Sequence, residues 1–507
     1  MRRIYYVIII TILLLILTGC DHITEQETSE RQSITILQEK FSDDFEGADN
    51  QWLKAVQELT DVNLTIDFIP TLIYTDEVNS LLFHNKLPMV VVANENVLES
   101  VLFISNVENN DFWVLDDYIE EFPNLFQFIG EEKWENCKIS GHIYGIPRLR
   151  ILPRNAACYR LDWAEKLGID PPQTLDELYD MLYAFTYDDP DGNGIADTFG
   201  LITSWSSWNH RSWNGIQTLT TALGGPNGWC YENGTMVPDF AADEYMQTLN
   251  FFRKLYADGI LTDNFAVINS LQKSELFVSG KGGMTFGVID DIFILQRQVC
   301  ENDPDARLGV LPLIHSEEDK WLVNATQGYN GLIMFNKSGD GGIHTEEELK
   351  RVLQYYDTLC SGEGQELINY GLEGAHHIID STGKKQLLYD DIGESTFSKS
   401  VGAYLQSFPV NAYVRRAGDT LLQNEVYDEI EKRMNYLVMD DSGGLVSATY
   451  KVNSSSLNDI IRNASIRFIL GEITENGYYQ KYEEWLENGG AEIITEYTEA
   501  YNDKNGK

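Results

Sequence analysis

Ser33-Ile34-Thr35-Ile36-Leu37 opens the stretch of sequence that decides the fold, and we interpret it as a strand. Residues 49–59 carry apolar side chains at helical spacing, and residues 62–69 alternate between polar and apolar as a second strand. Residues 76–83 are predicted to form a second helix, followed by a buried apolar run at 87–92. Strand, helix, strand, helix and strand in this order predict a parallel sheet with crossover helices.

Upstream of this sheet lies a segment that we predict is removed from the mature protein. Arg2 and Arg3 precede about 14 apolar residues, which is short for a membrane-spanning helix of ~20 residues but typical of a secretory signal. The small residues before Cys20 resemble a bacterial lipobox. By that resemblance, cleavage removes residues 1–19, and the Cys20 thiol receives a diacylglyceryl group whose acyl chains, such as palmitate, anchor the protein. Residues 20–32 are then a flexible, lipidated tether.

The charge balance argues against two kinds of partner. The 507-residue chain has 37 Lys and Arg against 79 Asp and Glu, for a formal net charge of −42. Loss of Arg2 and Arg3 with the signal removes two positive charges and leaves −44. Nucleic acids need Lys and Arg to neutralise their phosphates, and an anionic membrane repels an acidic surface. We interpret the acidic residues as solvated faces that aid solubility.

The cysteines predict neither a disulfide framework nor a zinc site. Beyond Cys20 the chain has five cysteines, at Cys137, Cys158, Cys230, Cys300 and Cys360. An odd number cannot pair completely, and no CxxC or CxxH spacing occurs. We expect at most one or two disulfides, with buried free thiols as the default.

An ordered set of motifs resembles a known family. After the lipobox and the strand at 34–37 come Tyr144-Gly145-Ile146-Pro147-Arg148, Tyr159-Arg160-Leu161-Asp162-Trp163, residues 189–197, residues 281–286 and Gly371-Leu372-Glu373-Gly374. Together they are similar to the extracellular solute-binding lipoproteins of carbohydrate ABC importers (family 1 type), and most of all to the large LipO-like branch of Gram-positive bacteria. The resemblance covers essentially the whole mature chain.

This resemblance implies an α/β protein with a two-lobed, type II periplasmic-binding-protein-like fold and a ligand cleft between the lobes. The first lobe would hold residues 33–150 and about 284–335. The second, helix-rich lobe would hold about 151–283 and 336–507. Such a layout suits ligand capture, because pockets form between lobes and hinge closure buries the ligand.

The sharpest local motif is a candidate calcium loop. It offers side-chain oxygens from Asp189, Asp191, Asn193 and Asp197 and the carbonyl of Ile195, at the spacing of an EF-hand-type loop. The family often has Glu at the next position, where this chain has Thr198, and position 12 is Gly200 in place of a bidentate carboxylate. A structural Ca²⁺ that pins the loop is therefore one interpretation, and a metal-free Asp/Gly/Asn turn is the other.

A polar loop after this motif contains Trp205, Trp208 and Trp213. Sugar C–H faces stack on aromatic rings, so these residues are candidate ligand platforms, and Trp205 and Trp208 are the strongest. The alternative is that any one of them anchors the core.

Further candidate ligand contacts follow predicted strands or turns: Tyr144, Arg148, Glu95, Asp290, Tyr329 and Glu373. Glu95 and Asp290 each follow a buried strand, where open α/β sheets bind ligands, although helix N-capping is an alternative for both. Arg148 could bind two hydroxyls or a carboxylate, or could form an interlobe salt bridge.

The chain has no GxSxG, HExxH or Walker A motif, and its eight His form no cluster. We therefore expect a binding protein and not an enzyme. It would be a monomer, lipid-anchored on the extracellular face of the cell membrane, and would deliver a sugar or oligosaccharide to ABC permease subunits. Two alternatives stay open: an exported carbohydrate-active enzyme with an Asp/Glu pair, or a calcium-stabilised sensing or adhesion module.

Overall fold

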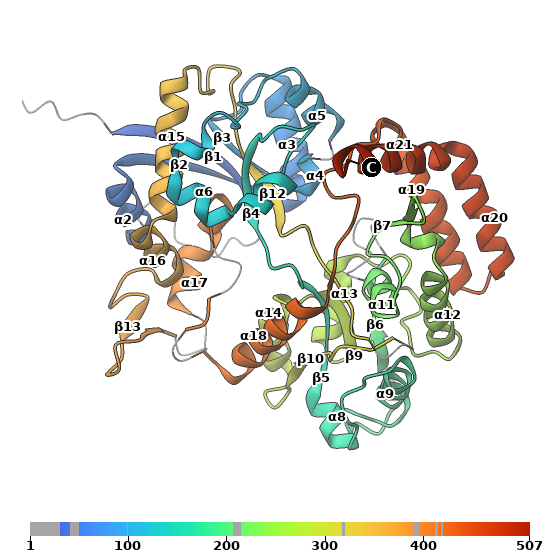
Figure 1. The fold of residues 1–507 in the computed structure, drawn as a ribbon. Coiled ribbons are helices and arrows are strands. Elements are labelled where there is room, and N and C mark those ends of the chain that lie inside the picture. Colours follow the sequence, from blue (N-terminus) through green and yellow to red (C-terminus); the bar gives the residue numbers. More distant parts are fainter. Residues whose placement is uncertain are drawn as a thin grey trace, which may run out of the picture.

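The computed structural model describes residues 31–40, 50–98, 100–205, 214–316, 320–389, 395–410, 414–416 and 419–506. Its two main sheets have helices around them and form the two lobes shown in Figure 1. None of the helices in this described part has the length and hydrophobicity needed to cross a bilayer.

The first lobe is built on a five-stranded sheet in the order β2-β1-β3-β12-β4. Its strands are β1 (Gln32–Lys40), β2 (Val62–Pro70), β3 (Val90–Ala93), β4 (Gly145–Leu149) and β12 (Tyr329–Phe335). β1 is parallel to β2 and β3, whereas β12 is antiparallel to β3 and β4. β1, β3 and β4 therefore end at the same edge of the sheet, and the parallel arrangement predicted for residues 33–92 is confirmed.

Local sequence explains the first crossover helix, α2 (Gln51–Thr60). The Asn50 side chain caps it by accepting bonds from the N–H groups of Trp52 and Leu53, at 2.8 and 3.2 Å. Asp61 ends it in a left-handed conformation with φ 53°. The second crossover helix, α3 (Thr71–Phe83), begins earlier than predicted, because it follows β2 directly after Pro70.

Further helices pack around the first sheet. They are α4 (Glu95–Leu98), α5 (Val101–Glu108), η1 (Ile119–Glu121), α6 (Pro123–Ile129), α7 (Glu131–Asn136), α15 (Glu346–Cys360), α16 (Gly362–Tyr370), α17 (Thr396–Val401) and η4 (Gly402–Ser407). A hairpin of β13 (His377–Ile379) and β14 (Lys385–Leu387) lies between α16 and α17.

The second lobe is built on a four-stranded sheet in the order β10-β5-β9-β6. Its strands are β5 (Asn155–Arg160), β6 (Phe199–Ile202), β9 (Gly282–Val288) and β10 (Leu308–Val310). Alternate residues of β5 enter two separate hydrophobic cores, Ala157 and Tyr159 in one and Ala156 and Cys158 in the other. Helices therefore cover both faces of this sheet.

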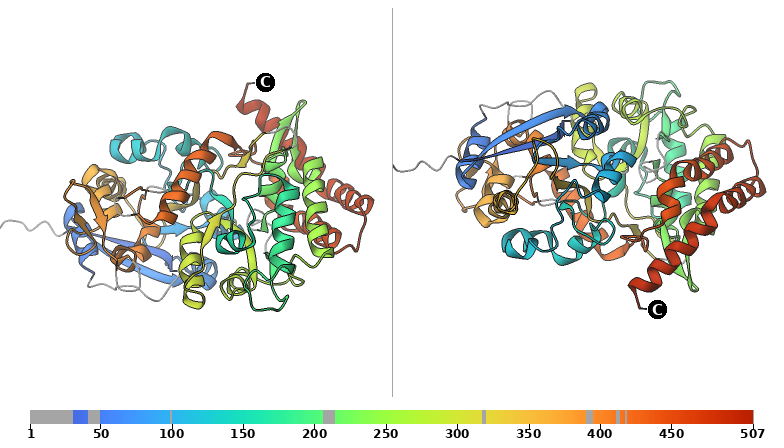
Figure 2. Two further views of the ribbon diagram at one scale, coloured as in Figure 1. Left: turned by 90° about the horizontal axis from the view of Figure 1, so that it is seen from below. Right: turned by 90° about the horizontal axis from the view of Figure 1, so that it is seen from above.

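The remaining elements belong to the second lobe or its edge. They are α8 (Leu161–Leu167), α9 (Leu175–Tyr187), α11 (Ile216–Ala222), β7 (Trp229–Glu232), β8 (Thr235–Pro238), η3 (Asp239–Ala241), α12 (Asp243–Ala257), α13 (Ser270–Val278), α14 (Asp291–Asn302), β11 (Val323–Asn324), α18 (Leu421–Arg433), η5 (Met434–Tyr436), β15 (Leu437–Val438), α19 (Ala448–Ile469), α20 (Glu475–Trp485), η6 (Leu486–Gly490) and α21 (Ala491–Lys504). Figure 2 shows the C-terminal helices on the outer side of this lobe, where Tyr245 of α12 bonds Ser465 of α19 at 3.0 Å.

Two parts of the predicted lobe division are wrong. β9, within the 284–335 segment assigned to the first lobe, pairs with β5 and β6 of the second sheet. Residues 336–408, assigned to the second lobe, instead supply α15, which buries Leu349 and Leu353 in the first core. The pairing partner of a strand and the core that a helix joins are long-range contacts, which local sequence patterns do not specify.

The chain crosses between the lobes at residues 150–154 and 311–328, and again between η4 and α18. The first two crossings bond each other: Arg150 N–H donates to the Gly328 carbonyl and Thr326 N–H to the Leu152 carbonyl, both at 2.8 Å. An ion pair between Lys451 and Glu108, at 3.4 Å, also joins the lobes. The five cysteines beyond the lipobox are free thiols, so no disulfide links the two lobes through them.

Candidate functional site

Polar side chains gather where β1, β3 and β4 end. Glu39, Asn94 and Arg148 are all less than 10% exposed. The Asn94 amide donates to a Glu39 carboxylate oxygen at 3.1 Å, and the Arg148 guanidinium donates to the amide oxygen of Gln406. Burial lowers the pKa of Arg148, while the Glu39 carboxylate opposes this shift. This buried network fixes the edge of the first lobe that faces the second.

Three arginines follow one another along the first crossing: Arg148, Arg150 and Arg154. Burial, together with the positive charges of the other two, lowers the pKa of Arg150 to about 9. Arg154 pairs with Asp290 at 3.0 Å, whereas no carboxylate of the described residues lies within 4.0 Å of Arg148 or Arg150. Guanidinium groups donate several fixed hydrogen bonds, so this crossing can bind hydroxyl or carboxylate oxygens of a ligand.

A cavity of about 260 Å³ lies beside the crossing and has walls from both lobes. Glu132 and Asn136 of α7 line it from the first lobe. Residues 439–443 and α21 line it from the second, and residues 325–327 of the second crossing complete it. A ligand in this cavity therefore touches both lobes and the hinge.

Tyr501 gives this cavity an aromatic wall. One face of its ring stacks on Tyr231, with centroids 4.2 Å apart and planes 14° from parallel. The exposed side chain of Gln327 adds an amide, and Asp440 and Asp441 add carboxylates. Stacking ring, amide and carboxylates together are the groups that bind the C–H faces and hydroxyls of sugars.

The predicted calcium loop joins α9 to β6 and folds its oxygen atoms toward one another. Gly194 N–H donates to the Asp189 carboxylate at 3.1 Å, and the Asn193 amide lies between Asp191 and Asp197, at 2.7 and 3.2 Å. Lys281 pairs with Asp197 and holds the pKa of that carboxyl below its usual value. The described residues form no group of three or more His, Cys, Asp or Glu close enough to hold a metal.

The donor set nevertheless fits Ca²⁺, because every candidate ligand atom is a hard oxygen. The missing carboxylate at position 12 has a structural cause. A Cβ at Gly200 would lie 2.1 Å from the Leu182 carbonyl oxygen, so β6 packs too closely on α9 for any side chain there. An ion would therefore have to be held without a carboxylate at position 12. Its ligands would be Asp189, Asp191, Asn193, Asp197 and the Ile195 carbonyl.

The comparisons with known proteins agree with this architecture. No family model matches the chain. The chain is 31% identical to Lipoprotein LipO of Bacillus subtilis (strain 168) over 500 residues, which are 96% of each protein. It is also 31% identical over 451 residues to the polygalacturonan/rhamnogalacturonan-binding protein YtcQ of the same organism, with 89% of this chain and 87% of YtcQ covered. The chain belongs to the solute-binding lipoproteins of carbohydrate ABC importers.

The fold of this solute-binding protein also matches solved structures. The Streptococcus pneumoniae ABC-transporter substrate-binding protein FusA, as an EF-hand mutant in complex with fructo-nystose, superposes with a TM-score of 0.67. The identity is 16%, and the match covers 94% of this chain and 100% of FusA. The predicted two-lobed fold is confirmed, and the chain is a binding protein and not an enzyme.

The solute-binding protein brings several of the predicted ligand residues to the interlobe edge. Arg148 ends β4, Glu95 is exposed at the start of α4 after β3, and Asp290 follows β9. Tyr329 begins β12 opposite Leu149, with its hydroxyl donating to the Asn136 carbonyl at 3.1 Å. The topology thus places these four where the two lobes face each other.

Tyr144 and Glu373 lie elsewhere. Tyr144 precedes β4, at the opposite end of the strand from Arg148, and is buried in the first core, away from the crossing and from the ligand role expected of it. Glu373 lies in the turn before β13 with an exposed side chain. None of the six predicted ligand contacts, including the four at the interlobe edge, lines the interlobe cavity itself.

Trp205 lies in the core of the second lobe and not on an open surface. It is 3% exposed, its ring centroid is 6.4 Å from that of Phe265, and its backbone N–H bonds the Phe265 carbonyl at 2.9 Å. For Trp205 the structure therefore agrees with the core-anchoring alternative and not with an open ligand platform. Trp208 and Trp213 lie outside the described residues.

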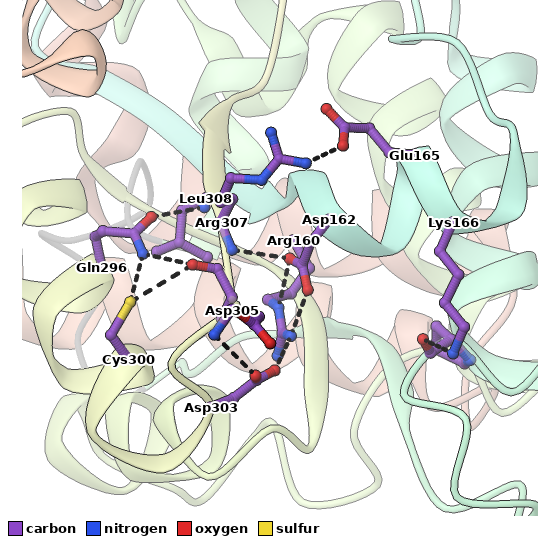
Figure 3. Close-up of polar contacts among 12 residues, drawn as sticks. Arg160, Asp162, Glu165, Lys166, Gln296, Cys300, Asp303, Asp305, Arg307 and Leu308 are labelled. Atoms are coloured by element: carbon purple, nitrogen blue, oxygen red, sulfur yellow. Dashed lines mark hydrogen bonds and ion pairs between the residues drawn. The ribbon is translucent and has the colours of Figure 1, made fainter.

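One motif of the family resemblance has a structural explanation. Arg160, 3% exposed, donates to Asp162 at 2.6 Å and to Asp303 at 2.7 Å, and its guanidinium lies 4.6 Å from the centre of the Trp163 ring. Figure 3 shows how these contacts tie the turn between β5 and α8 to the loop before β10, with Lys166 reaching the Pro190 carbonyl of the calcium-type loop at 2.8 Å. The motif stabilises the second lobe and lies outside the ligand site.

The interlobe region also contains residues that the sequence did not single out, of which Tyr501 lines the cavity. Glu39, Arg150, Gln406 and Tyr501 carry no local motif, and each reaches the interlobe region through the fold. The only sequence signal for any of them is the spacing of Arg148, Arg150 and Arg154, which places three positive charges within seven residues of an acidic chain.

Proposed function

We propose that this protein captures a saccharide between its two lobes at the cell surface and delivers it to ABC permease subunits. The observation that carries the proposal is the cavity of about 260 Å³ lined by α7, by α21 and by the second crossing. Because its walls belong to both lobes, closing the hinge tightens every contact with the ligand at once.

The chemistry of the cavity suits an oligosaccharide. Sugar hydroxyls donate to carboxylates and accept from amides, while the pyranose or furanose face stacks on Tyr501. Relatives differ in ligand charge: YtcQ is named for acidic pectic polymers and FusA for fructooligosaccharides. Arg150 favours a carboxylate-bearing sugar, and the acidic residues around Tyr501 favour a neutral one. A ligand screen therefore needs both oligogalacturonides and neutral oligosaccharides.

We expect Tyr501→Ala to weaken binding of the saccharide found in such a screen by about tenfold or more, because a buried stacking ring is a typical binding hot spot. Isothermal titration calorimetry measures the dissociation constant, and small-angle scattering with and without ligand measures closure. The wild-type radius of gyration should fall on binding.

Tyr183→Ala is the matched control, because Tyr183 lies on α9 of the same lobe, is 44% exposed and does not line the cavity. If Tyr501→Ala and Tyr183→Ala bind the saccharide with equal affinity, Tyr501 is not part of the binding site. Turnover of the bound sugar, or a radius of gyration that ligand leaves unchanged, would contradict capture by closure.

We also propose that the loop of residues 189–197 holds a structural Ca²⁺. The support is its oxygen donor set at EF-hand spacing, and the FusA structure is described as an EF-hand mutant. When bound, the ion would fix the connection between α9 and β6; it would take no part in chemistry. Asp197 would exchange its pairing with Lys281 for the ion.

Asp191→Ala is expected to abolish the stabilisation that calcium gives. An ion at 100 times its dissociation constant stabilises the folded state by about 2.7 kcal/mol, so wild type should melt several degrees higher in Ca²⁺ than in chelator. Differential scanning calorimetry on both proteins measures the difference. Asp170→Ala, an exposed carboxylate before α9, is the control and should respond to Ca²⁺ as wild type does. If the wild-type melting temperature does not respond to Ca²⁺, the loop binds no calcium and is a simple turn.

For localisation, we propose that the mature chain starts at Cys20 and is held on the extracellular face of the membrane by a lipid on that residue. The support is the lipobox-like sequence before Cys20 and the relation to a named lipoprotein.

A further inference from the structure

A second cavity, of about 330 Å³, lies within the second lobe and is separate from the interlobe site. Its floor is the face of β5 and β9 that carries small residues, Ala156, Cys158, Thr285 and Gly287. α13 and α14 form its walls. Larger side chains at these four positions would fill the space, so the small residues are what keep the cavity open.

The cavity opens to solvent between the two helices, which Figure 1 shows side by side below the crossings. Leu271 of α13 and Ile294 of α14 line it, and they are 68% and 52% exposed. Ile292 and Leu295 continue the apolar lining inward, where both are buried. Exposed large apolar side chains around a pocket mouth mark a surface that a ligand can cover.

Two charged residues line this apolar cavity, the buried Lys273 and the solvent-exposed Asp291. Lys273 is only 9% exposed and donates to the Phe286 carbonyl at 2.6 Å, which leaves two of its three N–H donors without a partner among the described residues. The Asp291 carboxylate lies over the next residue of β9, since a Cβ at Gly287 would be 3.2 Å from one of its oxygens. Lys273 and Asp291 are close, yet no ion pair of 4.0 Å or less joins them.

These two groups define what the cavity can bind. A group that accepts a hydrogen bond from Lys273 and donates one to Asp291 satisfies both, and a hydroxyl does so without adding charge. A carboxylate ligand would place a second negative charge beside Asp291, and an amine a second positive charge beside Lys273. A hydrocarbon would leave the buried Lys273 ammonium without an acceptor for its remaining N–H groups.

We propose that the cavity between α13, α14 and the second sheet binds a small uncharged amphiphile, whose hydroxyl bridges Lys273 and Asp291 and whose apolar part lies along Leu271, Ile294 and Leu295. Desolvation lowers the pKa of Lys273 and raises that of Asp291, which is the direction expected for two groups that lack direct ion pairing in an apolar site. This site does not depend on the interlobe saccharide.

The test uses 1-hexanol as the probe and the full-length mature chain. Ligand-observed NMR titration should show saturable binding of hexanol to wild type. Lys273→Met should weaken it about tenfold or more, because the apolar stem is kept while the ammonium that bonds the hydroxyl is lost. Lys254→Met is the matched control, since Lys254 is an exposed lysine of α12 in the same lobe and should leave hexanol affinity unchanged.

Hexanoate and hexylamine test the charge argument, and each should bind about tenfold or more weakly than hexanol. Ala156→Leu provides a second variant that fills the cavity floor and should also remove binding, so the proposal can be tested even if Lys273→Met fails to fold. Near-ultraviolet circular dichroism checks the fold of each variant. Absence of saturable hexanol binding, equal hexanol affinity in Ala156→Leu, or equal affinity for the three probes would overturn the proposal.

Discussion

Trp205→Ala is expected to lower the free energy of unfolding by about 3–5 kcal/mol, the range for removing a buried Trp or Phe side chain. Trp205 is 3% exposed in the larger core of the second lobe, and it packs against Phe265. Its indole N–H has no hydrogen-bond partner in the described structure, so the ring stabilises the fold through packing and not through that group. Urea unfolding monitored by far-ultraviolet circular dichroism measures the change.

Trp321→Ala is the control for this measurement, because Trp321 is 40% exposed, with an edge contact to Tyr436 and the Lys432 ammonium 5.7 Å from its ring centre. It should cost far less stability. If Trp205→Ala unfolds at the wild-type urea concentration and loses saccharide affinity, then the ring is the ligand platform that the sequence suggested and its buried position is wrong.

Cys20→Ser is expected to move the protein completely from the membrane to the medium. The lipid is attached through the cysteine sulfur, and a serine hydroxyl does not accept it at this position. Without acyl chains, an acidic chain of net charge −44 has no affinity for an anionic bilayer. Fractionation of cells followed by immunoblotting measures the distribution.

Cys230→Ser controls for the loss of a thiol as such, because Cys230 is a free, half-buried cysteine of the second lobe. It should stay with the membrane. A Cys20→Ser protein that partitions into detergent as wild type does would contradict the lipid anchor.

The sequence predicted local structure best where short-range chemistry determines it. Thr174 and Glu177 have the spacing of a capping box, which predicts a helix start at this point, and both of its bonds are present at the start of α9. Gly168 is a residue type that commonly ends helices, and it ends α8 in a left-handed conformation with φ 71°. The alternation and helical spacing over residues 33–92 likewise predicted β1, β2, β3 and the helices between them, because each of these patterns is contained within one element.

Contacts between distant segments explain what could not be predicted. Whether β9 joins the first or the second sheet depends on β5, more than 120 residues earlier in the chain, and not on its own composition. Trp205 is surrounded by polar residues in sequence, yet Phe265 and the second core bury it in space. Tyr144 and Arg148 are four residues apart, and the strand between them places them at its opposite ends.

The position of β12 between β3 and β4 has a consequence for secretion. A chain leaving the cell N-terminus first exposes β3 and β4 long before Tyr329–Phe335 emerges to pair with both. The second core likewise includes residues as late in the chain as Tyr497, so it cannot form before they have emerged. Neither lobe can close co-translocationally, so the nascent protein passes through a long stage with open sheet edges, a state prone to aggregation and proteolysis. On the proposed export route, extracytoplasmic folding factors and quality-control proteases would meet an incomplete first lobe until Phe408 has emerged and an incomplete second lobe until Tyr497 has emerged.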